Sequence, residues 1–179
     1  MLRLQWVGSV VGAVPPLIGW VAATGGIDTG GMVLAAALYA WQFPHFNALS
    51  WNLRGDYSRA GYRMMSVTDP KLCRQVALRY SAAMIHISLM ASYCGMCDWW
   101  LALDSTVING FLTYRAWQFY KDANDQTARK LFMASIWHLP ALLILYMVHK
   151  VYSDDDDDDD ADVESGVGGD SELASLAAA

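Results

Sequence analysis

The chain has 179 residues, of which 55% are apolar, and a formal net charge of −6. That charge is unevenly distributed, because residues 153–179 carry 11 acidic side chains and no Lys or Arg. Residues 1–152 therefore hold all 12 basic residues and 7 acidic ones, and they contain no Glu. So few charges cannot cover a body of this size in water, which excludes an ordinary soluble globular protein.

Five long apolar runs predict helices that cross a membrane, since a bilayer core of about 30 Å needs roughly 20 mostly apolar residues. The runs are 6–24, 32–49, 78–96, 106–120 and 131–148. The fourth run is short and contains Arg115, so a short interfacial segment is an alternative there. Asp69 followed by Pro70 is typical of a helix start and precedes the third run. The predicted fold class is an all-α integral membrane protein with about five transmembrane helices.

The connections between these runs alternate in charge. Residues 50–77 and 121–130 are rich in Lys and Arg, whereas Asp supplies every charge in residues 25–31 and 98–105. The positive-inside rule then places the N-terminus and both basic connections on one inner side of the membrane. Residues 1–152 form one predicted transmembrane domain. Residues 153–179, with seven consecutive Asp, form a predicted acidic disordered tail.

The first basic connection has the residue types that bind a magnesium diphosphate. Asp56, Arg59 and Arg63 are spaced i, i+3 and i+7, which predicts that they share one face of a helix. A carboxylate holds Mg²⁺ through oxygen, and arginine forks bind the remaining phosphate oxygens. The alternative is an ordinary surface ion pair in a positive-inside loop, and the spacing alone leaves both interpretations open.

Histidines within the predicted spans are the other candidates. His45 and His138 each lie next to a proline, and His86 lies within the third run. Ionisable residues inside spans are functional candidates, and a neutral imidazole is an axial ligand for haem iron. The alternative is a His that bonds a backbone carbonyl freed by the proline, an interpretation that we prefer for His86.

Five motifs carry a resemblance to a known family. They are GAVPPLIGW at 12–20, WQFPHFNALSW at 41–51, RGDYSRAGY at 54–62, MMSVTDP at 64–70 and WHLP at 137–140. Through them the stretch from about residue 6 to residue 148 resembles the C-terminal half of the haem-farnesylating (haem O synthase) family. That family is part of the UbiA-type intramembrane aromatic prenyltransferase superfamily.

The resemblance implies a nine-helix membrane bundle with two aspartate-rich motifs at its inner face, of which the connection after residues 32–49 matches the second. It implies that Asp56 binds Mg²⁺ and acts in catalysis with Arg59. The implied substrate-binding residues are Arg54, Arg63, Tyr57, His45 and His138. The implied reaction transfers a farnesyl group from farnesyl diphosphate to a vinyl group of haem B and gives haem O, a step of haem A biosynthesis for cytochrome c oxidase.

The same resemblance implies a location in the mitochondrial inner membrane, with the basic connections facing the matrix. The expected partners are farnesyl diphosphate, haem B and the lipid bilayer, with haem A synthase or a second copy of the chain as a protein partner and no nucleic acid. The alternative function is a non-catalytic membrane protein that binds haem or serves in assembly.

Two departures from the family pattern affect these expectations. Gly55 stands where the family usually has an acidic residue. The first aspartate-rich motif is absent from these residues. The sequence therefore predicts an incomplete copy, without the N-terminal half and inactive alone.

Overall fold

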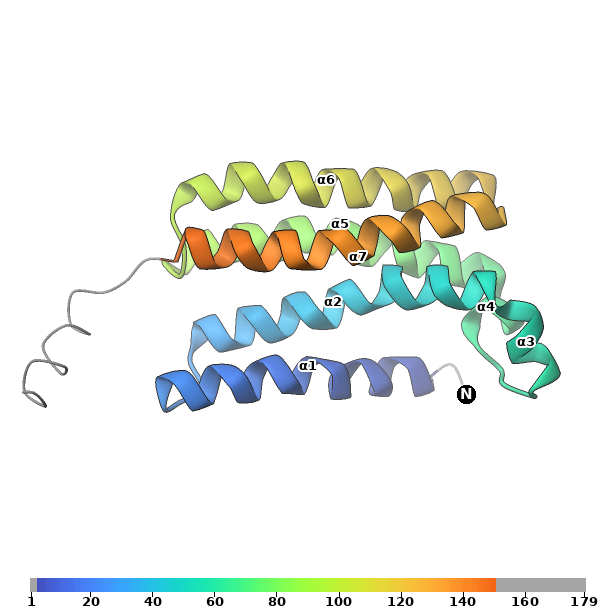
Figure 1. The fold of residues 1–179 in the computed structure, drawn as a ribbon, viewed down its shortest axis with the longest axis horizontal. Helices are drawn as coiled ribbons and strands as arrows, with labels where there is room; N and C mark the ends of the chain where they lie inside the picture. The colour runs from blue at the N-terminus through green and yellow to red at the C-terminus, as the bar shows by residue number, and fades with distance from the viewer. Residues whose placement is uncertain (1–2, 151–179) are drawn as a thin grey trace, which may run out of the picture.

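The computed structural model describes residues 3–150, with side chains from Trp6 onward. The predicted acidic tail at 153–179 lies outside the described residues. All regular elements in the described part are helices (Figure 1). They are α1 (Arg3–Thr24), α2 (Thr29–Asn52), α3 (Arg54–Arg59), α4 (Met65–Thr68), α5 (Pro70–Tyr93), α6 (Trp99–Asp122) and α7 (Asp125–Val148). The all-helical prediction is therefore confirmed.

Polar side chains define where three of the long helices begin. Asp28 accepts a hydrogen bond from the backbone N–H of Gly31 at 2.9 Å and caps α2. Asp69 caps α5 in the same way and is followed by Pro70, as the sequence predicts. Asn124 caps α7 through the N–H of Thr127 at 2.7 Å. These caps satisfy backbone donors that the first turn of a helix leaves free.

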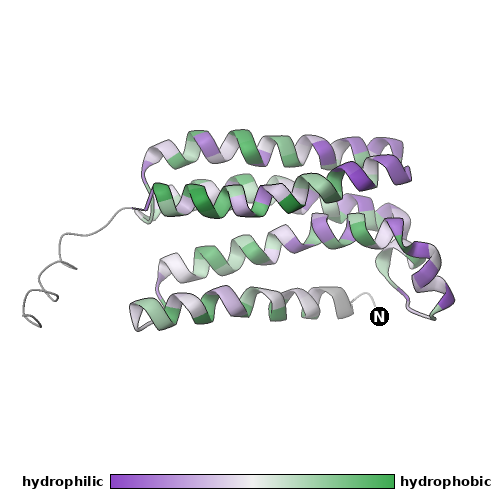
Figure 2. Ribbon diagram, viewed as in Figure 1, coloured by the Kyte–Doolittle hydropathy of each residue, from purple (hydrophilic) through white to green (hydrophobic). Residues whose placement is uncertain are grey.

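Four of the long helices pack as a bundle. α2 and α6 each contact both α5 and α7, and α1 lies along α2. The chain runs up and down, so the α2–α5 connection, with α3 and α4, lies at the same end of the molecule as the α6–α7 connection (Figure 1). Figure 2 shows hydrophilic residues concentrated at that end, while green apolar residues are prominent on α1 and on the C-terminal half of α7. The two basic connections thus meet at one end.

A buried polar network joins three of the helices. The Asn109 amide on α6 donates to the Met84 carbonyl at 3.2 Å and to Ser88 Oγ at 2.9 Å, both on α5. Its Oδ1 lies 2.8 Å from Nε2 of His138 on α7. Tyr146 Oη approaches Ser88 Oγ at 3.3 Å. Because buried polar groups are costly unless they are bonded, this network favours one register of the three helices.

The predicted spans need two corrections. The segment at residues 106–120 is not short, because it belongs to α6, which runs for 24 residues. Its charge is accommodated, since the Arg115 guanidinium lies 5.0 Å from the Phe111 ring centroid and bonds the Gln118 amide oxygen. α5 and α7 also begin earlier than the runs 78–96 and 131–148, at their polar caps. By length and composition, two described helical segments are apolar enough to cross a membrane, Trp6–Thr24 and Asp125–Val148.

Replacing Asn109 tests the buried network. Asn109→Leu removes the partner of His138 Nε2 and two bonds to α5, so we expect a loss of about 1–2 kcal/mol in the free energy of unfolding. Asn52→Leu is the matched control, because the exposed Asn52 amide bonds a carbonyl of its own helix. Denaturation in detergent followed by circular dichroism measures both. Equal losses for the two variants would contradict a register role for Asn109.

Candidate functional site

α3 presents Asp56 and Arg59 to solvent at the basic end of the bundle. The two side chains are one turn apart and form an ion pair, and both are mostly exposed, with side-chain exposures of 62% and 81%. An exposed pair of this kind contributes little to stability. Asp56 and Arg59 can therefore separate at little cost. The carboxylate can then bind a divalent cation, and the guanidinium can bind an anionic group of the same ligand.

Arg63 does not share that face, so the prediction of one helical face for Asp56, Arg59 and Arg63 is wrong in this respect. α3 ends at Arg59, and Gly61 adopts a φ of +76° that L side chains rarely take. The chain therefore turns before Arg63, whose side chain is exposed. Within the turn, the Tyr57 ring packs edge-on to Tyr62 at 6.3 Å.

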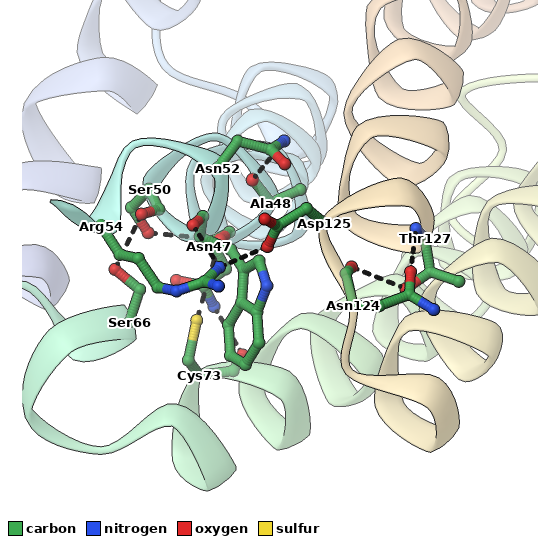
Figure 3. Close-up of polar contacts among 11 residues, drawn as sticks. Asn47, Ala48, Ser50, Asn52, Arg54, Ser66, Cys73, Asn124, Asp125 and Thr127 are labelled. Atoms are coloured by element: carbon green, nitrogen blue, oxygen red, sulfur yellow. Dashed lines mark hydrogen bonds and ion pairs between the residues drawn. The ribbon is translucent and has the colours of Figure 1, made fainter. Parts of the chain in front are cut away.

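Arg54 joins the start of α3 to the start of α7 (Figure 3). Its guanidinium donates to the Trp51 carbonyl at 3.0 Å, lies 5.1 Å from the Trp51 ring centroid and pairs with Asp125. One turn before Trp51 on α2, the buried Asn47 amide donates to the Cys73 carbonyl and links α2 to α5. Arg54 is thus engaged with groups outside α3, whereas Arg59 pairs with Asp56 of its own helix and Arg63 is exposed.

His45 is held between α2 and α7 in one tautomer. Ser135 Oγ donates its single proton to the Phe132 carbonyl at 2.6 Å, so it must accept at its 2.9 Å contact with His45 Nδ1. His45 therefore carries its proton on Nδ1 and a lone pair on Nε2. The ring stacks on Trp41 with centroids 4.5 Å apart, and Trp41 itself donates to the Ser135 carbonyl.

His138 has the opposite arrangement. Because the Met84 carbonyl can only accept, the Asn109 amide nitrogen faces it and the amide oxygen faces His138. The proton of His138 is then on Nε2, and its Nδ1 is buried with no hydrogen-bond partner among the described residues. The His138 side chain is 3% exposed. Its geometry favours a structural role, and its predicted contact with substrate stays a prediction.

His86 fits its preferred interpretation only in the backbone contact, because its side chain is exposed and no proline frees the carbonyl that it approaches. It is exposed on α5, and its Nδ1 lies 3.3 Å from the Ala82 carbonyl of the preceding turn.

Two adjoining grooves near the basic end were not anticipated from the sequence. One, of about 520 Å³, lies where α2 ends and α7 begins, with Asn52 and Arg129 among its lining residues. The other, of about 880 Å³, follows α6 and α7, with Arg115 and Lys130 on its walls. Arg129 lines both. The signal in the sequence is the basic pair Arg129 and Lys130, which by loop charge alone indicates only orientation.

The metal-binding capacity of the site is limited. Within residues 3–150, no group of three His, Cys, Asp or Glu side chains is arranged to hold a metal ion. Asp56 is the one carboxylate of α3, and Gly55 beside it has open space around its Cα.

The comparisons identify the class of protein. Residues 4–139 match the model of the UbiA prenyltransferase family, and the chain belongs to that family. No solved structure matches the chain.

The chain is similar to several proteins named "Protoheme IX farnesyltransferase, mitochondrial". It is 52% identical to the one from Homo sapiens over 145 residues, which cover 81% of this chain and 33% of that protein. It is 45% identical to the one from Debaryomyces hansenii and 43% identical to the one from Saccharomyces cerevisiae, covering 35% and 36% of them. The chain thus spans about a third of the length of these relatives.

Removing the Ser135 hydroxyl tests the tautomer of His45. Ser135→Ala deletes the acceptor of the Nδ1 proton, so we expect the Nδ1-protonated form to lose its dominance. Nitrogen-15 NMR of labelled histidine in micelles distinguishes the two tautomers. Ser81→Ala is the matched control, because that buried hydroxyl bonds the Ala77 carbonyl of its own helix. An unchanged His45 spectrum in Ser135→Ala would contradict the assignment.

Proposed function

We propose that this chain forms part of a membrane prenyltransferase that transfers the farnesyl group of farnesyl diphosphate to a vinyl group of haem B. The product is haem O, the precursor of the haem A of cytochrome c oxidase. Family membership and the names of the relatives support this proposal. The observation that carries it at the level of the site is the exposed Asp56–Arg59 pair at the basic end of the bundle. The length of the relatives favours a site completed by further chain.

The proposal includes five spans. The five long helices have 22 to 24 residues, and at 1.5 Å per residue each extends about 33–36 Å, enough for a bilayer core of about 30 Å. With the basic connections at one end, the positive-inside rule orients that end to the matrix side of the mitochondrial inner membrane.

In the proposed site, Asp56 and the arginines bind the diphosphate end of the substrate. Mg²⁺ typically takes one or two protein carboxylates together with substrate phosphate oxygens, so the single carboxylate of Asp56 fits this donor set. When bound, the cation supplies positive charge that stabilises the leaving diphosphate. Arg59, released from Asp56, and Arg63 contribute guanidinium groups to the remaining phosphate oxygens. Arg54 keeps α3 against α7, and Tyr57 lies beside Asp56 to contact the same ligand.

The proposed reaction balances without a redox partner. The bond between the allylic carbon of the farnesyl group and the diphosphate oxygen breaks, and its electron pair stays with the diphosphate. A vinyl carbon of haem B supplies the electrons for the new carbon–carbon bond. Water then adds to the resulting cation and loses a proton, which gives a hydroxyethylfarnesyl group. Fixed positive charge at the basic end stabilises the departing anion in the transition state.

His45 is the better of the two histidines for contact with haem iron. Its Nδ1 proton is held by Ser135, so its Nε2 lone pair is the one presented. Histidines that ligate a metal through one ring nitrogen typically donate a hydrogen bond from the other ring nitrogen. The same observation supports the second candidate function, a membrane protein that binds haem without catalysis. A measurement of Mg²⁺-dependent farnesyl diphosphate binding separates the two candidate functions, because only the prenyltransferase needs it.

Asp56→Asn tests the role of the carboxylate. The amide keeps the shape but loses the charge that holds Mg²⁺. With the N-terminal portion of the human relative present, we therefore expect transfer to fall below detection and haem binding to stay within about twofold. Asp122→Asn, another exposed acid at the same end of the bundle, is the matched control. Haem O by mass spectrometry and haem titration by Soret absorbance give the two readouts. If haem binding fell in parallel with transfer, Asp56 would have no metal role.

Gly55→Asp tests the departure from the family pattern. A side chain at Gly55 meets no atom within 4 Å, so an acid there adds a second carboxylate without a clash. We expect the Mg²⁺ concentration for half-maximal farnesyl diphosphate binding to fall about tenfold. Gly55→Asn controls for the added volume and the lost glycine. A similar Mg²⁺ requirement in both variants would show that the metal is held away from α3.

A further inference from the structure

The groove along α6 and α7 combines a basic end with an apolar length. It encloses about 880 Å³, and its basic residues Arg115, Arg129 and Lys130 lie near the end where α6 passes into α7. The rest of the lining is mainly apolar and includes Phe111, Met133 and Trp137. None of the described residues that line it is acidic.

The three cations lack acidic partners in the described part of the chain. The ion pairs there are Arg54–Asp125, Arg59–Asp56 and His149–Asp104. Arg115 is instead held against the Phe111 ring, with one bond to Gln118, which fixes its guanidinium on the groove wall. A wall with three unneutralised cations favours an anionic group.

The apolar part of the groove matches one leaflet of a bilayer. From Lys130 to Ala141, the last lining residue on α7, eleven steps of 1.5 Å give about 16 Å, about half of a hydrocarbon core of about 30 Å. Trp137 is 77% exposed and Val107 is 74% exposed. An aromatic and an aliphatic side chain are therefore available to an acyl chain. The groove therefore offers a charged site and an apolar slot in the order that a lipid needs.

We propose that this groove binds one anionic phospholipid, with its phosphate at Arg115, Arg129 and Lys130 and an acyl chain along Phe111, Met133 and Trp137. Basic pockets between membrane helices on the inner side are recognised sites for such headgroups. No residue of α3 lines the groove, so the proposal does not depend on the diphosphate contacts of Asp56 and Arg59. His138, for which a substrate contact is predicted, lies on the groove wall.

The test compares two double variants that remove the same charge. Arg129→Gln with Lys130→Gln removes two groove cations. Lys71→Gln with Arg79→Gln removes two exposed cations of α5 that do not line the groove. Phosphatidylglycerol and phosphatidylcholine with the same acyl chains are titrated onto the full chain in detergent, and native mass spectrometry counts bound lipid. Circular dichroism checks that each variant keeps its helices.

We expect phosphatidylglycerol to bind more tightly than phosphatidylcholine, and the groove variant to weaken it by about 30-fold. The α5 variant should change it by less than about threefold. Equal weakening in the two variants would show general charge attraction and overturn the proposal. Displacement of the lipid by an excess of inorganic phosphate would assign the cations to a free anion. Loss of lipid on adding the N-terminal portion of the human relative would assign the groove to a protein segment.

Discussion

The fold depends on polar side chains that are buried inside an apolar bundle. An unpaired amide or imidazole there would cost free energy that few other contacts could offset. Asn109 therefore ties α6 to α5 and α7, and Trp41 ties α2 to α7 through the Ser135 carbonyl. Gln42 does the same for α1 by donating to the Ser9 carbonyl. These bonds constrain the axial position of each helix, which aligns the connections at one end.

The alignment of the helix connections brings the candidate site residues together at one end of the bundle. α3 and the start of α7 lie there together because Arg54 pairs with Asp125 across the two connections. Asp56 and Arg59 stay exposed beside this junction, where their charges can meet a diphosphate. The basic residues Arg129 and Lys130 of the grooves lie in the first turns of α7 at the same end. The positive charge of the two basic connections is thus available to ligands.

Much of the helical plan follows from the sequence, since apolar runs and caps such as Asp69–Pro70 act locally. The length of α6 does not, because Arg115 is accommodated by Phe111 and Gln118. The face shared by Asp56 and Arg59 is predictable, whereas the loss of Arg63 from it depends on the left-handed backbone at Gly61. The different hydrogen bonds of His45 and His138 depend on partners from distant helices, which spacing cannot reveal.

The proposed function requires that this chain carries one part of a farnesyl transfer site. The most direct measurement is haem O by mass spectrometry in lipid nanodiscs that contain haem B, farnesyl diphosphate and Mg²⁺. The chain is tested alone and with the N-terminal portion of the human relative, after its insertion has been verified. We expect haem O only when both are present. No haem O in either case would contradict this expectation and favour a haem-binding protein without catalysis.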